Sequence, residues 1–302
     1  MLAFPKRVQI VEVGPRDGFQ NIKTFIETKV KQQVIDGMIA AGVQVMEVTS
    51  FVHPKAIPQM VDAVQIAKTA AQAAGDTFRG LALVPNLTGA KKAYECGIGE
   101  VTYVISASEQ HNLANINRTR EQSLEDLQKI VTQVPELAVR LDVATAFGCP
   151  LGGKVDDEMV VSLIESALQI GVQSVVLCDT IGVAHPKQVY ERARTVKNRF
   201  SNVSFGLHLH DTRGMGLANT LAGLDAGITI FESSIGGLGG CPFAPGAAGN
   251  TATEDLVNMF HGMGISTGIH LERYLTVVQM VRERIQAVLT GHMAYARQYD
   301  DI

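Results

Sequence analysis

The chain has 302 residues, of which 46% are hydrophobic and 19% charged, and its formal net charge is −4. This much apolar material excludes an intrinsically disordered chain, and the irregular spacing of its 29 glycines excludes a collagen-like one. The slightly acidic balance disfavours general nucleic-acid binding, which needs a clustered basic surface. The sequence contains no run of about 18 apolar residues that could span a membrane, and we expect no signal peptide at its start.

The four cysteines, at positions 96, 149, 178 and 241, are widely separated. They are too few for a disulfide framework in a chain of this length, and they lack the Cys-x-x-Cys spacing of a structural zinc site. We therefore expect a soluble, cytoplasmic protein from a reducing compartment.

Eight short apolar, β-branched runs recur along the chain, and a longer stretch follows each of them. The runs are residues 8–14, 43–50, 80–85, 100–106, 138–145, 172–180, 203–210 and 228–234. Strands that alternate with helices predict βα units and a parallel sheet. Eight such units within about 230 residues predict an α/β fold, namely a closed (β/α)8 TIM barrel.

The intervening segments are predicted to be helical, with apolar residues at three-to-four spacing over 27–41 and 57–74. Glycines at positions 42, 97, 171 and 227 are typical of left-handed helix ends before the next strand. No linker divides residues 1–302, so we expect one catalytic barrel domain with a closing helix and an extra C-terminal helical segment at roughly 265–292. An open doubly wound sheet is the alternative, but the first turn, Gly-Pro-Arg-Asp-Gly, does not match Gly-x-Gly-x-x-Gly.

Polar side chains gather at the carboxyl ends of the predicted strands, where barrels of this kind carry their chemistry. They include Arg16, Asp17, Glu47, Ser50, Ser106, Asp179, His208, His210 and Glu232. Because strand residues two apart share a face, both imidazoles should point into the barrel mouth, where they could bind a divalent metal. The first strand neighbours the eighth and lies near the seventh, so Asp17 adds a carboxylate to that site. The alternative is that the two histidines are ordinary core or supporting residues.

Two histidines and a carboxylate without a thiolate favour an octahedral ion such as Mg²⁺, Mn²⁺, Co²⁺ or Fe²⁺. An iron oxygenase can have the same ligands, but nothing in the sequence points to oxygen chemistry. Asn250 has two interpretations. Its amide oxygen could reach the metal as a hard ligand, or it could precede a helix whose capping box is Thr251-x-x-Glu254. The residues alone favour the second interpretation.

A glycine-rich segment, residues 235–250, directly follows the eighth run and contains Cys241. Its backbone can approach a ligand closely, but it lacks the Walker pattern and any lysine, which disfavours a phosphate loop. We predict a lid that closes over substrate, with Cys241 as its working group. The alternative is that Cys241 is a small apolar filler, which is the role we expect for Cys96, Cys149 and Cys178.

Several segments together resemble the 3-hydroxy-3-methylglutaryl-CoA lyase family, a group of metal-dependent TIM-barrel lyases related to isopropylmalate synthase. The two most specific are Glu-Val-Gly-Pro-Arg16-Asp17-Gly-Phe-Gln20-Asn21 and Gly-Leu-Gly-Gly-Cys241-Pro. Others are Glu47-Val-Thr-Ser-Phe, Asn115-Ile-Asn117, Asp179-Thr-Ile-Gly and His208-Leu-His210-Asp-Thr-Arg-Gly. The resemblance extends over nearly the whole chain.

The resemblance implies cleavage of 3-hydroxy-3-methylglutaryl-CoA to acetyl-CoA and acetoacetate by a homodimeric enzyme that uses Mg²⁺ or Mn²⁺. The metal ligands that it implies are Asp17, His208, His210 and Asn250, which reverses the preference for Asn250 as a cap. It places Arg16 at the thioester oxygen and Cys241 as the mobile acid/base group, and it leaves Asp17 and His208 as candidates for the base. The residues expected to bind the coenzyme A thioester are Arg16, Gln20, Glu47, Ser50 and Asp179.

The chain departs from the family pattern at several positions. Phe19 and Ile22 replace a leucine and a glutamate, Leu113 and Ala114 replace basic residues, and Cys178 replaces a glycine. These changes cluster where coenzyme A or the acyl tail would be held, so the reaction class is better determined than the substrate. The alternatives are a lyase for another 3-hydroxyacyl-CoA, of the 3-alkylglutaryl or citramalyl type, and a non-catalytic barrel scaffold.

Cys241 should be the most reactive thiol, because a cysteine between glycines is accessible and a nearby Arg16 or metal favours its thiolate. One equivalent of an alkylating reagent should label Cys241 first and inactivate the enzyme, and a substrate analogue should protect it. Cys241→Ser should keep metal binding and lose most turnover, because a hydroxyl is a far weaker acid than a thiol. Peptide mapping decides the matter: if another cysteine is labelled first, or if Cys241→Ser keeps wild-type turnover, the loop is only a lid.

Overall fold

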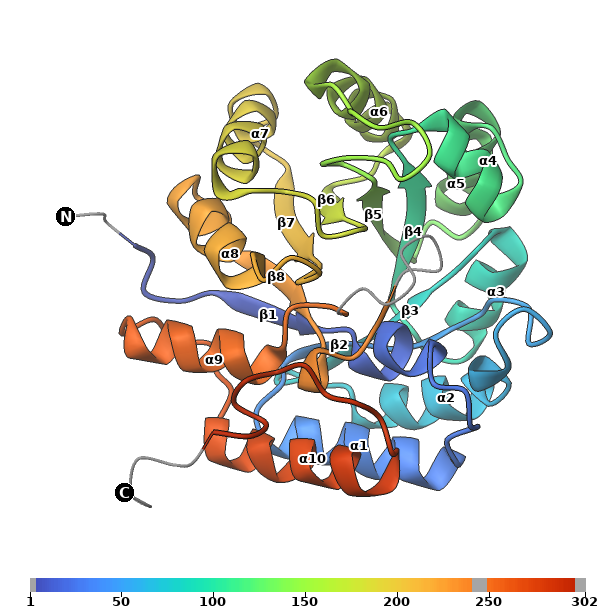
Figure 1. Cartoon of the computed structure of the whole chain (residues 1–302). Helices are drawn as coiled ribbons and strands as arrows, with labels where there is room; N and C mark the ends of the chain where they lie inside the picture. The colour runs from blue at the N-terminus through green and yellow to red at the C-terminus, as the bar shows by residue number, and fades with distance from the viewer. Residues whose placement is uncertain (1–3, 241–248, 297–302) are drawn as a thin grey trace.

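A barrel of eight parallel strands forms the centre of the computed structural model, which describes residues 4–240 and 249–296 (Figure 1). The strands are β1 (Gln9–Glu12), β2 (Val45–Ser50), β3 (Arg79–Leu83), β4 (Glu100–Ser106), β5 (Ala138–Ala144), β6 (Ser174–Asp179), β7 (Ser204–Leu209) and β8 (Ile230–Ser233). They pair in chain order, and β8 pairs with β1 to close the barrel. The predicted (β/α)8 fold is confirmed.

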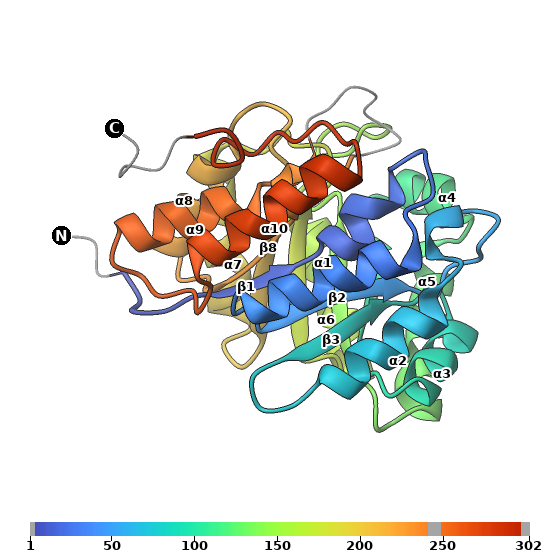
Figure 2. The ribbon, with the colours of Figure 1, turned by 90° about the horizontal axis from the view of Figure 1, so that it is seen from below.

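The helices form a ring outside the strands (Figure 1). They are α1 (Thr28–Ala40), α2 (Ala63–Ala73), α3 (Leu87–Glu95), α4 (Glu109–Ile116), α5 (Arg120–Gln133), α6 (Asp157–Ile170), α7 (Pro186–Arg199), α8 (Gly216–Asp225), α9 (Thr253–Gly262) and α10 (Leu271–Arg284). Helix α10 packs beside α1 and α9, on the side of the barrel where the chain closes (Figure 2). Among the described helices, none has the length and apolar character needed to cross a membrane.

The four glycines predicted to end helices all have left-handed backbone angles, with φ of 97°, 87°, 113° and 86° at positions 42, 97, 171 and 227. Gly42 ends α1 where the chain passes close to Gly268. A Cβ atom on Gly42 would lie 2.3 Å from the carbonyl oxygen of Gly268. Two features therefore require glycine at position 42: its left-handed backbone angle and the close approach of Gly268.

Two predicted helical segments are shorter than expected. The segment 57–74 contains a 3₁₀ turn, Pro58–Met60, before α2 begins, because the side chain of Gln59 bonds to the loop after β1, with its amide nitrogen 2.8 Å from the carbonyl oxygen of Ile22. Within 265–292 only α10 is helical, and it ends just before Gln286, which is left-handed with φ of 53°. The chain beyond it bonds to the loop after β8, where the amide of Thr290 donates to the carbonyl of Gly236 over 2.8 Å.

The loop after β1 also differs from the prediction. Arg16 and Asp17 do not end the strand but lie in a π-helical turn, Gly14–Gly18, whose last amides donate to the carbonyl of Val13. This turn bends the chain across the carboxyl end of the barrel. Both side chains are therefore buried at the barrel mouth.

Glu12, at the end of β1, connects this turn to three distant segments. Its buried carboxylate accepts hydrogen bonds from the amides of Gly14 (2.7 Å) and Ile235 (2.9 Å), from the hydroxyl of Thr253 (2.6 Å) and from the hydroxyl of Tyr274. Burial raises the pKa of Glu12. The carboxylate thus links the turn after β1, the loop after β8, α9 and α10.

Gly42→Ala should lower the free energy of unfolding more than Gly264→Ala does. Both glycines are left-handed, with φ of 97° and 73°, so both substitutions cost about 1–2 kcal/mol of backbone strain. Only at Gly42 would the new methyl group overlap a neighbour, since nothing lies within 4 Å of a Cβ on Gly264. Urea denaturation of both variants measures the difference, and equal losses would contradict the tight packing of Gly42 against Gly268.

Candidate metal and active site

Three ligand-type side chains meet at the barrel mouth. Atoms of Asp17, His208 and His210 that could bind a metal all lie within 4.8 Å of one another, and all three residues are buried. Asp17 comes from the π-helical turn after β1, His208 from β7, and His210 directly follows β7. The strand alternation predicted this meeting, and the two imidazoles approach through their Nε2 atoms at 3.2 Å.

Asn250 joins this cluster. Its side-chain nitrogen donates to Asp17 Oδ2 over 2.6 Å and to the carbonyl of Leu238 over 2.9 Å. Its Oδ1 atom is buried and has no hydrogen-bond partner among the described residues. A buried carbonyl oxygen without a partner, beside two imidazoles and a carboxylate, is a candidate fourth metal ligand.

The capping interpretation of this segment is wrong. Helix α9 begins after Ala252, with no side-chain cap. Thr251 instead donates its hydroxyl to the carbonyl of Leu209 over 2.9 Å, and Glu254 accepts the amide of Gly236 over 3.0 Å. Both side chains of the expected capping box therefore form tertiary hydrogen bonds and do not cap α9. Burial raises the pKa of Glu254 to about 8.

The charge states of these groups suit a divalent cation. Burial opposes ionisation of Asp17, but the charges of Arg16, His208 and His210 outweigh it and hold its pKa below the ordinary value. Burial, with the charge of His208, lowers the pKa of His210 to about 4, so this imidazole is neutral near pH 7. The Nε2 atoms of the two imidazoles lie 3.2 Å apart, near enough for one ion to bind both. The oxygen and nitrogen donors therefore fit Mg²⁺ or Mn²⁺.

Arg16 lies against this cluster. Its Nη1 donates to Asp17 Oδ1 over 2.9 Å, and its Nε donates to Glu47. Glu47 lies within β2, and burial raises its pKa although Arg16 opposes the shift. Gln20 donates to the same Asp17 oxygen over 2.7 Å. Arg16 and Gln20 thus orient the carboxylate of Asp17.

Two residues predicted to bind substrate have local structural bonds. Ser50 accepts the amide of Val52 over 3.3 Å at the end of β2. Asp179 accepts the amides of Val183 (2.9 Å) and Ala184 (3.0 Å), and burial raises its pKa. Both side chains shape the turns after their strands. Their contact with substrate stays a prediction.

Three charged residues inside the barrel received no role from the sequence. Glu232, at the end of β8, accepts from His208 Nδ1 over 2.9 Å, and Arg140, on β5, donates to Glu232 over 3.1 Å. Asp142 is buried two residues from Arg140 on the same face of β5, and burial and the charge of Glu232 raise its pKa well above its ordinary value. The available signal was a pair of charges two apart in an otherwise apolar strand.

Cys241 lies outside the described residues, so its predicted role rests on the sequence. Cys96, Cys149 and Cys178 are free and buried, as expected for structural cysteines. Cys149 has a defined local function, since its sulfur accepts the amide of Gly152 over 3.1 Å.

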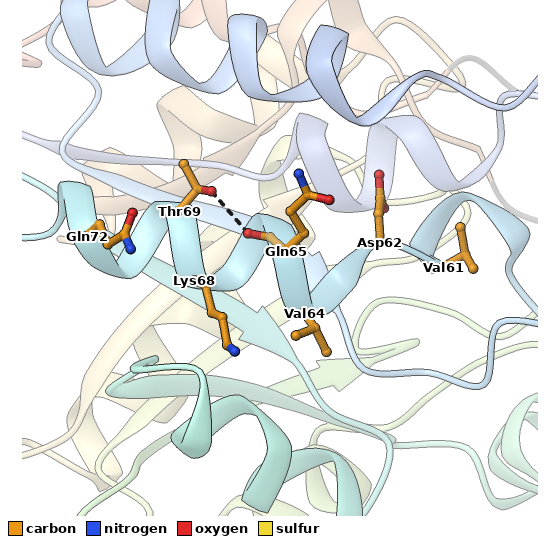
Figure 3. A pocket seen from close by; sticks show the side chains of 7 residues that line it. All are labelled: Val61, Asp62, Val64, Gln65, Lys68, Thr69 and Gln72. Carbon is orange, nitrogen blue, oxygen red and sulfur yellow. Dashed lines mark hydrogen bonds between the residues drawn. The ribbon is translucent and has the colours of Figure 1, made fainter.

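A surface hollow lies away from these residues, on the outer side of α2 (Figure 3). Its lining consists of Val61, Asp62, Val64, Gln65, Lys68, Thr69 and Gln72. It contains no predicted site residue, and the hydroxyl of Thr69 donates to the carbonyl of Gln65 within its own helix. We therefore assign the chemistry to the barrel mouth.

Metal binding should weaken as the pH falls. Burial disfavours the imidazolium of His208, but the hydrogen bond and charge of Glu232 outweigh it, so its pKa lies above 6.5. Protons therefore compete with a metal at His208 below that raised pKa, whereas His210 is neutral down to about pH 4. The Kd for Mn²⁺ should rise about tenfold for each pH unit below that pKa, because one proton is displaced.

His210→Ala should raise the same Kd more than about 100-fold, beyond the effect of removing an outer partner. His261→Ala, on α9, is the matched control. Titrations with Mn²⁺ followed by electron paramagnetic resonance measure both effects. A pH-independent Kd, or equal Kd values for the two variants, would contradict the site.

Comparisons with known proteins agree with this geometry. A family model described as HMGL-like matches residues 7–281. The chain is 43% identical over 286 residues to a hydroxymethylglutaryl-CoA lyase of Bacillus subtilis, covering 94% of this chain and 95% of that protein. It is 42% identical over 274 residues to (R)-citramalyl-CoA lyase of Chloroflexus aurantiacus, covering 87% and 86%.

A solved structure of an HMG-CoA lyase from Acinetobacter baumannii, in complex with coenzyme A and 3-methylmalate, is also similar. Its sequence is 38% identical, its TM-score is 0.94, and the match covers 100% of this chain and 99% of that one. The resemblance found in the motifs is therefore confirmed, and the chain belongs to the HMGL-like family as a hydroxymethylglutaryl-CoA lyase-like enzyme.

Proposed function

We propose that the protein is a metal-dependent carbon–carbon lyase that cleaves 3-hydroxy-3-methylglutaryl-CoA to acetyl-CoA and acetoacetate. One observation carries the proposal: Asp17, His208 and His210 converge beside the unpartnered oxygen of Asn250, with Arg16 next to them. The relatives named as hydroxymethylglutaryl-CoA lyases support this substrate. The relative solved with coenzyme A supports a coenzyme A thioester as the substrate.

The reaction breaks the bond between C2 and C3 of the acyl group. The C3 hydroxyl loses its proton and becomes the ketone of acetoacetate, and the electron pair of the broken bond passes to C2 and the thioester as an enolate. Protonation of C2 completes acetyl-CoA. Asp17, His208, His210 and Asn250 would hold Mg²⁺ or Mn²⁺, and the ion would supply Lewis acidity that lowers the pKa of the C3 hydroxyl.

The residues of the chain supply the other steps. Arg16 is permanently charged, and its guanidinium would offset the developing enolate charge on the thioester oxygen. Asp17 and His208 are the two candidates for the base that accepts the hydroxyl proton. Cys241 is proposed to donate the proton to C2 after lid closure excludes water, an assignment that rests on the sequence.

A citramalyl-type thioester is the second candidate substrate. The match to (R)-citramalyl-CoA lyase, at 42% identity, is nearly as strong as the match to the Bacillus subtilis enzyme. Both substrates are 3-hydroxyacyl thioesters that release acetyl-CoA, and they differ in the group on C3. The same metal and arginine would serve either reaction, so the choice depends on the residues that hold the acyl tail.

A scaffold without activity is disfavoured by the converging ligand set, since a barrel without chemistry has no need for it. We also propose a cytoplasmic location, as expected from the sequence, and a homodimer, as the resemblance implies. Cell fractionation measures the location directly, and light scattering at several protein concentrations measures the oligomeric state.

The deciding experiment is turnover of both thioesters by metal-loaded enzyme. Acetoacetate should accumulate from 3-hydroxy-3-methylglutaryl-CoA, with a kcat/KM at least tenfold above that for citramalyl-CoA, which would yield pyruvate. The opposite ratio would establish the second candidate. Failure with both, together with no binding of Mn²⁺, would leave the scaffold interpretation.

Arg16→Lys separates catalysis from binding. Lysine keeps the charge but loses the planar fork that spans Asp17 and Glu47. We expect kcat to fall by about 10²–10³, by analogy with the loss of one oxyanion donor, with little change in KM. A raised KM at unchanged kcat would make Arg16 a binding residue only.

A further inference from the structure

A row of four hydrogen-bonded side chains runs from the candidate metal site into the barrel. His208 Nδ1 lies 2.9 Å from one oxygen of Glu232, and the other oxygen of Glu232 lies 3.1 Å from Arg140 Nη1. The Nη2 atom of the same guanidinium lies 3.3 Å from Glu100. The four residues come from β7, β8, β5 and β4, so this row of side chains crosses the barrel interior.

The central pair is deeply buried, which needs a reason. The side chains of Arg140 and Glu232 are 2% and 3% exposed. A buried ion pair is weak support for stability, because an apolar pair of similar size often does as well. The family's proposed chemistry assigns neither residue a task. Their position behind a metal ligand points to one.

The hydrogen bond from His208 determines which ring nitrogen is free. Glu232 faces the permanently charged Arg140 on its other side, so its carboxylate accepts at both oxygens. His208 must then donate from Nδ1, which leaves the lone pair of Nε2 directed toward His210 Nε2, 3.2 Å away. Metal-binding histidines commonly need this kind of outer partner, which fixes the ring and makes the ligand nitrogen more basic.

Arg140 holds Glu232 in this orientation. Its planar guanidinium uses one nitrogen for Glu232 and another for Glu100, so a single rigid group connects two carboxylates on different strands. A lysine presents one nitrogen and cannot span both in the same way. Without the fork, the carboxylate of Glu232 loses the contact that sets its rotation.

We propose that Glu232 and Arg140 are positioning residues for metal binding: Glu232 fixes the tautomer and orientation of His208, and Arg140 fixes Glu232. The proposal deepens the proposed function, since it rests on a divalent ion at His208. It assigns these two residues no contact with substrate.

The test compares Kd values for Mn²⁺ by electron paramagnetic resonance, which needs no turnover. Glu232→Gln and Arg140→Met should each raise the Kd about 10- to 100-fold. We expect weaker binding with glutamine because its side-chain NH₂ group, when it faces Arg140, is a second hydrogen-bond donor where Arg140 needs an acceptor. Arg140→Lys should give an intermediate Kd. The matched control is Arg192→Met on α7. Arg192 is also buried, but it lies outside the barrel interior and donates a hydrogen bond of 2.7 Å to Asp157.

Thermal unfolding of each variant accompanies the titrations, because a merely structural role would lower Tm and leave the Kd unchanged. The proposal is overturned if Arg140→Met binds Mn²⁺ with the wild-type Kd. If the methionine variant does not fold, the same result with Arg140→Lys overturns it. It is also overturned if Arg192→Met weakens binding as much as Arg140→Met. Absence of Mn²⁺ binding by the wild type would instead refute the metal site of the proposed function, so the two failures are distinguishable.

Discussion

Closure of the barrel between β1 and β8 is the constraint on which the site depends. Asp17 and Asn250 are 233 residues apart in the chain, and they share a hydrogen bond of 2.6 Å only because the first strand pairs with the last. The pairing also brings β7 within reach, so both histidines face the same carboxylate. The ligands therefore come from the two ends of the sequence, and neither half of the chain contains the site by itself.

Some buried polar atoms without partners lie inside the barrel, and others lie away from it. Glu47 Oε1, Asp142 Oδ1 and Asn250 Oδ1 are buried and have no hydrogen bond within the described residues. Each such atom costs free energy unless a ligand or water supplies the missing bond. The apolar packing of the barrel and its helices has to offset that cost. For Asn250 Oδ1, the proposed divalent ion would supply that bond.

The fold was predictable from the sequence because buried parallel strands are near-continuous apolar runs, and left-handed glycines end the helices between them. The histidine pair was predictable because strand side chains alternate. The absence of a helix cap at Thr251 was not predictable. The local motif is present in the sequence, but the side chains of Thr251 and Glu254 form tertiary hydrogen bonds instead. The pairing of Glu232 with Arg140 was also missed, since it joins strands 92 residues apart and depends on barrel geometry that no local spacing encodes.

The bond between Tyr274 and Glu12 has a consequence for synthesis of the chain. The two residues are separated by 262 positions, and Glu12 accepts this hydroxyl at the same carboxylate that supports the turn carrying Arg16 and Asp17. On the ribosome, the turn near the N-terminus emerges early but lacks this support until α10 has left the exit tunnel. The turn that carries Arg16 and Asp17 therefore gains this hydrogen bond only after α10 has been synthesised and has packed against the barrel.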